Sequence, residues 1–288
     1  MIHFRIKAAL FVILFLSCIA VLDYPFLARI YNDRISGTVM EAYENRIGSL
    51  DDTGRRIQEA EAFNELLRDG FCAMADPVSF LSETGSDPAS VCRRLLCPDD
   101  SGTAGYIEIP SINLRLPLYP DVSDESLEKG ACILPGSSLP VGGAGTHCCI
   151  SGHSGLPERT MFTNLDLIKK GDLIRLHVLG LSLAYEMVSS EVVLPTEVDS
   201  LAVLPEEDLL TLITCTPYGI NSHRLYIHAR RVKAEEDTAP LSYGRTDEAP
   251  VSWLKRNWWM IATAYLFILM VVLTDLYLGK HREEKSMG

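Results

Sequence analysis

Short β-prone runs alternate with turn residues from residue 106 to residue 232, and this alternation limits the fold more than any other feature of the chain. Several short strands at close spacing predict an all-β barrel or sandwich. Within the series, the stretch LHVLGLSLAY predicts a hairpin that turns near Leu179 and Gly180. The runs are YIEIP, LRLPLY, THCCISGH, LIRLHVLG, LSLAYEMV, EVVLP, LLTLITCT and RLYIHARRV.

An apolar segment lies on each side of this region. The first, residues 8–22, is 15 residues long, carries no charge and follows a histidine, an arginine and a lysine, which is typical of a signal-peptide core or a short membrane anchor. The second, residues 258–278, is 21 residues long, enough to cross about 30 Å of hydrocarbon. Basic residues near both ends predict cytoplasmic termini, with residues 23–257 outside the cytoplasm.

The charge and the composition of the chain exclude two classes of protein. The net charge is −12, from 26 Lys and Arg against 38 Asp and Glu, and no basic block is present. Nucleic-acid binding is excluded as a function, because phosphate neutralisation needs clustered basic side chains. With 47% hydrophobic and 22% charged residues, the chain is not intrinsically disordered.

Two segments carry reactive residues where a β-prone run meets a turn. In ISGHSGLP the residue is His153, and in TLITCTPYGINSHR it is Cys215. Arg224 begins the next run, and the loop between them can fold back to bring Cys215 and Arg224 together. A thiolate attacks carbonyl carbon, a histidine moves protons to and from amines, and a guanidinium stabilises an oxyanion. This set suits acyl transfer through a thioester.

The string TLITCTPYGINSHR closely resembles the active-site motif of sortases, in particular the pilin-type class C branch, and ISGHSGLP resembles the histidine motif of that family. The likeness extends through residues 105–232. It implies a mainly β fold, an eight-stranded sortase-type β-barrel with N-terminal helices and two terminal membrane segments. It also implies a membrane-bound cysteine transpeptidase that acts outside a Gram-positive cell, without a metal or organic cofactor.

The resemblance further implies a role for each site residue. Cys215 attacks the Thr–Gly bond of an LPxTG-like sorting signal in a pilin or surface protein, and a thioacyl enzyme forms. A lysine amine of the next pilin resolves this intermediate, which assembles a pilus. His153 acts as general acid and base, and Arg224 holds the substrate backbone and the oxyanion. Thr214 is expected to pack near Cys215 and to contact the substrate.

Class C sortases also have a lid, an Asp-Pro-aromatic element that covers the catalytic cysteine. The candidate lid residues of this chain are Asp76, Pro77 and Phe80. The aspartate would pair with Arg224 and the phenylalanine would cover Cys215, although a valine follows the proline where the family has its aromatic residue. A surface turn is the alternative. Residues 81–85 (LSETG) resemble the substrate motif, but they lack its proline and are interpreted as a chance match.

These patterns divide the chain into segments. Gly48 and Gly54 are expected to break the N-terminal region into two helices that pack on a neighbouring domain. The predicted segments are a signal or anchor (1–22), a helical region (23–70), a lid and insertion of loop character (71–104), a catalytic β-barrel (105–232), a linker (233–257), a transmembrane helix (258–279) and a cytoplasmic tail (280–288).

Of the eight cysteines, six remain when Cys18 in the apolar segment and the candidate nucleophile are set aside. An even number outside the cytoplasm allows disulfides, and a bridge between Cys92 and Cys97 would stiffen the insertion. The alternative is that several are free buried thiols. A zinc site built from Cys72, Cys92 and Cys97 lacks a fourth ligand. The six are Cys72, Cys92, Cys97, Cys132, Cys148 and Cys149.

Three other functions compete with pilus assembly. A sortase that anchors surface proteins to peptidoglycan would use the same barrel with a different amine acceptor. A non-catalytic membrane scaffold with a sortase-like barrel would not need the intact set of cysteine, histidine and arginine. A thiol-redox protein is disfavoured, because no Cys-x-x-Cys pair lies near the candidate site.

Overall fold

A computed structural model describes residues 2–70 and 88–232 of the chain. The candidate lid, the linker at 233–257 and the expected transmembrane helix at 258–279 lie outside the described residues. Within the described residues, no single helix is both long and apolar enough for a membrane span. The bent pair Leu14–Val21 and Asp23–Gly48 meets those criteria by length and composition alone.

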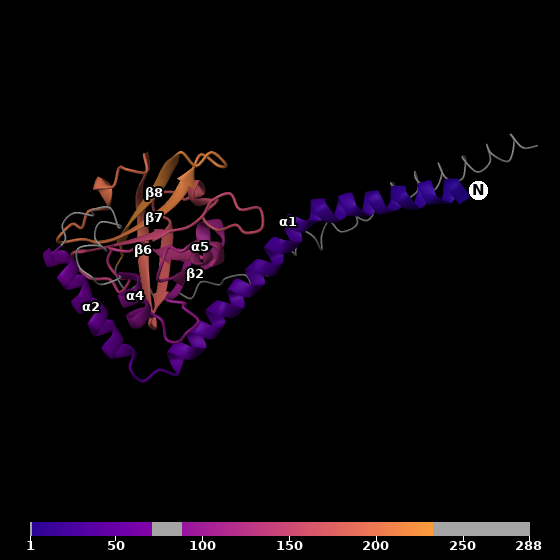
Figure 1. Cartoon of the computed structure of the whole chain (residues 1–288). Helices are drawn as coiled ribbons and strands as arrows, with labels where there is room; N and C mark the ends of the chain where they lie inside the picture. The colour runs from indigo at the N-terminus through magenta and orange to yellow at the C-terminus, as the bar shows by residue number, and fades with distance from the viewer. Residues whose placement is uncertain (1, 71–87, 233–288) are drawn as a thin grey trace, which may run out of the picture. The chain divides into compact units, whose positions relative to one another are not determined.

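Eight strands close into a single barrel, in the order β1-β2-β3-β4-β7-β8-β6-β5, and this confirms the predicted barrel (Figure 1). Most neighbours are antiparallel, but β4 runs parallel to β7 and β2 runs parallel to β3. The strands are β1 (Gly105–Ile109), β2 (Leu114–Tyr119), β3 (Ala131–Ile133), β4 (Thr146–Ser151), β5 (Leu173–Val178), β6 (Leu181–Val193), β7 (Asp208–Thr216) and β8 (His223–Arg231).

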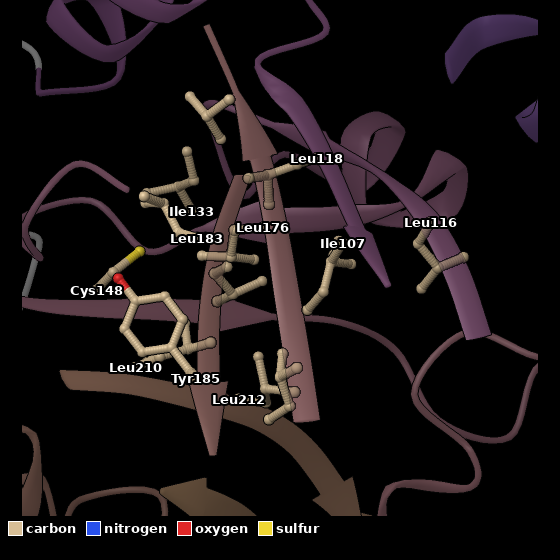
Figure 2. Close-up of a cluster of buried hydrophobic side chains, with 14 of the residues drawn as sticks. Ile107, Leu116, Leu118, Ile133, Cys148, Leu176, Leu183, Tyr185, Leu210 and Leu212 are labelled. Carbon is tan, nitrogen blue, oxygen red and sulfur yellow. The ribbon is translucent and has the colours of Figure 1, made fainter. Parts of the chain in front are cut away.

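Alternating side chains of these strands fill the barrel. Ile107, Leu176 and Leu212 come from three different strands and are fully buried in one cluster. Figure 2 shows how side chains from several strands point toward one another in this core. Because neighbouring strand residues point to opposite faces, the remaining residues of each strand lie on the outer surface of the barrel.

The strand boundaries differ from the sequence prediction in two places. The run EVVLP is not a separate strand, because residues 191–193 continue β6 beyond a bulge between Met187 and Ser189. The short strand β3 was not predicted, since three residues are too few for a recognisable pattern. The predicted hairpin is confirmed: Leu179 and Gly180 join β5 to β6 with φ of 51° and 78°, the positive values that a tight two-residue turn needs.

Two N-terminal helices are present, and α2 and the C-terminal part of α1 pack on the barrel, as predicted. Helix α1 (Ile2–Gly48) ends at the first glycine, whereas Gly54 lies inside α2 (Thr53–Gly70) and does not break it. The buried Tyr43 hydroxyl donates to the Ala104 carbonyl and accepts from the Leu179 amide, each at 2.9 Å. Asn64 on α2 exchanges two hydrogen bonds with the backbone of Leu139, at 3.0 and 2.7 Å. These buried polar contacts fix the C-terminal part of α1 and α2 against the barrel.

The prediction of an irregular loop over residues 71–104 was wrong for its second half. Residues Pro88–Leu96 form helix α4. The apolar side of this helix is buried in the main core and consists of Cys92, Leu95 and Leu96. The free energy gained by this burial outweighs the preference of the surrounding segment for turns. Cys92 and Cys97 are free thiols, so the bridge considered above is not formed. The described residues hold four further short helices: η1 (Pro110–Ile112), α5 (Asp124–Lys129), η2 (Leu165–Leu167) and η3 (Asp199–Leu201), of which all but α5 are 3-10 helices.

Candidate active site

Cys215 and Arg224 face each other across two neighbouring strands. They are paired positions in the antiparallel register of β7 and β8. Leu212 on β7 and Ile227 on β8 belong to the barrel core. Each lies three residues from its strand's site residue, and an odd separation along a strand means opposite faces. Cys215 and Arg224 therefore lie on the outer face of the barrel. Both side chains are partly exposed. The loop between the strands therefore folds back and brings the cysteine and the arginine together.

His153 follows β4, the strand beside β7. In the parallel register Ser151 is level with Ile213, so two more residues bring His153 level with Cys215. The Gly152 amide donates to the Ile213 carbonyl at 3.0 Å, which extends the pairing beyond the end of β4. The adjacent ends of β4, β7 and β8 thus bring together all three predicted catalytic residues.

Two hydroxyl groups hold the backbone on both sides of His153. Thr214 Oγ1 donates to the Gly152 carbonyl at 2.8 Å, and Ser154 Oγ donates to the Cys215 carbonyl at 2.6 Å. The sequence predicts that Thr214 contacts the substrate. Because its side chain is buried and its hydroxyl is bonded to the histidine loop (residues 152–164), the structure favours a positioning role.

The histidine loop also rests on the barrel core. Phe162 is fully buried, and its amide donates to the His153 carbonyl at 2.9 Å. A Cβ atom added at Gly152 would lie 2.7 Å from the Phe162 ring, which is closer than real Cβ contacts. The ring therefore occupies the space that any larger side chain would need, and the residue before His153 has to be glycine.

The loop between β7 and β8, residues 217–222, contacts the histidine loop from the other side. Arg224 Nη1 donates to the carbonyls of Asn221 and His223, at 3.2 Å each. The ring of Tyr218 lies against Gly155, where an added Cβ would be 3.2 Å from the nearest ring carbon. The Tyr218 side chain is nevertheless exposed. The two loops thus meet at the surface of the barrel beside the three residues.

Exposure separates Cys215 from the other cysteines of residues 88–232. Cys215 is partly exposed, whereas the other five are buried free thiols. Burial raises the pKa of all five, and it raises those of Cys97 and Cys149 to about 12. Because the thiolate is the attacking form, these five are poor nucleophiles. They are Cys92, Cys97, Cys132, Cys148 and Cys149.

Sequence reasoning missed Ser154 and Phe162 as parts of the site. The hydroxyl directly after His153 was a visible signal, but its acceptor lies 61 residues away and is brought near only by the β4–β7 register. Over residues 2–70 and 88–232, no group of three or more His, Cys, Asp or Glu side chains is placed to hold a metal ion.

Comparison with known proteins gives a consistent family assignment. The family model described as Sortase domain matches residues 107–232. Sortase A of Staphylococcus aureus (strain NCTC 8325 / PS 47) is 36% identical over 141 residues, which cover 48% of this chain and 66% of that protein. The chain therefore spans about two thirds of the length of that relative.

Solved structures of sortase C match over most of their length. The crystal structure of Streptococcus pneumoniae Sortase C, described as informative on pilin substrate specificity, is 36% identical with a TM-score of 0.59, covering 68% of this chain and 97% of that chain. The pilus-related Sortase C of Group B Streptococcus is 34% identical with a TM-score of 0.59, covering 68% and 98%. The chain belongs to the sortase family, and its structural neighbours are the pilin sortases of class C.

Proposed function

We propose that the protein is a membrane-anchored cysteine transpeptidase that cleaves an LPxTG-like sorting signal between Thr and Gly and joins the new carbonyl to a lysine amine of a pilin. The observation that carries the proposal is the pairing of Cys215 with Arg224 across β7 and β8, with His153 held level with them. The pilin link is supported by the sortase C neighbours, one described as pilus-related.

The reaction follows from the chemistry of the three side chains. The Cys215 thiolate attacks the threonine carbonyl carbon, and a tetrahedral oxyanion forms. The C–N bond then breaks, His153 gives a proton to the departing glycine amine, and a thioester remains on Cys215. The incoming lysine amine attacks the thioester, His153 accepts its proton, and the C–S bond breaks to release the Cys215 thiolate as the isopeptide bond forms.

Arg224 is suited to the charge that appears in both steps. A guanidinium stays protonated, and it offers five N–H donors in a planar fork. Only Nη1 is used in the two contacts with the carbonyls of Asn221 and His223. The remaining donors can bond the oxyanion and the substrate backbone, an interaction that stabilises the transition state more than the ground state.

The membrane part of the proposal is supported by the sequence. The apolar segments 8–22 and 258–278 flank the barrel, and their basic flanks favour cytoplasmic termini with the barrel outside the cytoplasm. A sorting signal on a secreted pilin and the catalytic barrel would then be on the same side of the membrane.

The direct test is to incubate the full chain in detergent with an LPxTG-type peptide and to follow the protein by intact mass spectrometry. We expect an acyl adduct on Cys215 that hydroxylamine releases, and an isopeptide product when a lysine peptide is added. Peptide cleavage without an adduct at Cys215 would contradict the mechanism. A product formed only with a glycine-based peptidoglycan mimic would instead favour wall anchoring.

Ser154→Ala is expected to lower kcat about threefold to tenfold with little change in KM, because the mutation frees the backbone next to His153 and removes no substrate contact. Ser154→Thr should restore most of the rate, since it restores the hydroxyl. Ser126→Ala is the matched control: it also removes a 2.6 Å hydroxyl hydrogen bond, to Asp121, and should leave kcat unchanged. Equal losses in both alanine variants would disprove the positioning role.

A further inference from the structure

Four polar side chains from four adjacent strands form a continuous hydrogen-bonded chain on the outer face of the barrel. The distances are 2.7 Å from His147 Nε2 to Thr211 Oγ1, 2.9 Å from Thr211 Oγ1 to His228 Nδ1 and 3.1 Å from His228 Nε2 to Glu191 Oε1. We call these four residues the polar row. They line a groove of about 330 Å³ together with Ser200. None of them has a role in the proposed reaction.

Both ends of the polar row reach the same short turn. His147 Nδ1 lies 3.0 Å from the Ala202 carbonyl, at the C-terminal end of η3. At the other end, a hydrogen bond from Ser200 in η3 lowers the pKa of the Glu191 carboxyl, and the contact with His228 lowers it further. The polar row therefore crosses β4, β7, β8 and β6 and is bonded at each end to η3.

The Ala202 carbonyl can only accept, and it fixes the direction of the first hydrogen bond of the polar row. His147 therefore carries its proton on Nδ1, and burial lowers the pKa of this ring, which keeps it neutral. Its Nε2 must accept, so the Thr211 hydroxyl donates to it. The same hydroxyl oxygen then accepts from His228 Nδ1. Since the Glu191 carboxylate can only accept, this arrangement makes His228 Nε2 a donor as well.

The turn held in this way lies next to the candidate active site. Leu201 of η3 is buried in a small cluster with Cys149, Ile213 and Tyr226. Along the outer face of β7 and β8, Ile213 and Tyr226 form the cross-strand pair next to that of Cys215 and Arg224. Leu201 therefore links η3 to the outer surface of the barrel next to the pair of Cys215 and Arg224.

We propose that the polar row is a positioning device for substrate binding, which fastens η3 to the barrel beside Cys215 through a neutral His147 and a charged His228. The effect on substrate rests on the proposed transpeptidase function, whereas the protonation states and the hold on η3 do not. The four residues are positioning residues, because none of them reaches the reacting atoms.

Thr211→Val breaks the polar row in its centre with a side chain of the same shape. We expect amide exchange at Leu201 and Ala202, which donate to the Val198 and Asp199 carbonyls, to become about tenfold faster, since one buried hydrogen-bond chain no longer opposes opening. KM for the sorting peptide should rise about threefold to tenfold while kcat stays the same. Thr211→Ser should restore both values.

Thr146→Val is the control for a lost threonine hydroxyl. Thr146 Oγ1 donates to the Gly143 carbonyl at 2.7 Å and contacts Asp208 Oδ1 at 3.3 Å, outside the polar row. This variant should leave exchange at Leu201 and Ala202 unchanged. Equal exchange in Thr211→Val and wild type would overturn the proposal.

Nitrogen NMR of the full chain labelled at histidine reads the protonation states directly. At pH 7 we expect two protonated ring nitrogens for His228 and one, Nδ1, for His147, with signals assigned by their loss in His228→Gln and His147→Gln. A neutral His228 would overturn the assignment. If the wild type forms no acyl adduct, the transpeptidase proposal fails, while exchange and NMR still decide whether the polar row holds η3.

Discussion

Cys215→Ala is expected to remove the acyl adduct and to lower the rate of isopeptide formation by at least about 10⁴-fold, because loss of the nucleophile leaves only binding and oxyanion stabilisation. The fold should be kept, since the partly exposed Cys215 side chain lies outside the barrel core. The measurement is the initial rate of product formation by liquid chromatography and mass spectrometry, together with the melting temperature of the variant.

Cys149→Ala is the matched control for this experiment. Cys149 lies on the neighbouring strand β4 and on the same outer face, but it is fully buried and its pKa is raised to about 12. Its replacement should cost about 1 kcal/mol of stability and leave the acyl adduct in place. A Cys215→Ala variant whose rate stays within tenfold of the wild type would disprove nucleophilic catalysis by this residue.

Phe162→Ala is expected to lower the free energy of unfolding by about 3–5 kcal/mol, the usual cost of removing a fully buried aromatic ring. It should also lower kcat in the fraction that remains folded. The ring packs against Gly152, and without it the residue before His153 loses the contact that defines its place. Chemical denaturation gives the first quantity, and the acyl-transfer rate per folded molecule gives the second.

Leu176→Ala separates loss of stability from loss of the site. Leu176 is fully buried on β5 in the same core, and its truncation should cost about 2–5 kcal/mol without moving the histidine loop. Phe162→Leu covers the case in which the alanine variant does not fold. If both Phe162 variants and Leu176→Ala have the wild-type rate per folded molecule, the core does not position His153.

The sequence predicts the barrel well, because its strands are local patterns with clear turns between them. It also predicts the meeting of Cys215 and Arg224, since a short loop between consecutive strands permits only an antiparallel return. Residues whose roles depend on long-range register were missed. Ser154 bonds a carbonyl 61 residues away, and His147 bonds a threonine 64 residues away. Nothing in the adjacent sequence indicates either partner.

Helix α4 was missed for a different physical reason. Its segment contains few residues and lies among glycine, serine and proline, which favour turns. Burial of Leu95 and Leu96 in the main core provides the free energy that local propensity lacks. The bulge after Met187 was not predicted either. One inserted residue shifts the alternation of inward and outward side chains but leaves the segment β-prone, so the sequence still reads as a strand.

That bulge divides β6 into two parts that can evolve separately. Before it, Leu183, Tyr185 and Met187 point into the core, so their size is fixed by packing. After it, the side-chain phase is reversed, and Glu191 and Val193 pair with Tyr226 and Arg224 on the outer face. If Cys215 acts as proposed, substitutions in the second part can change substrate preference without disturbing the interior, even though both parts belong to one continuous strand.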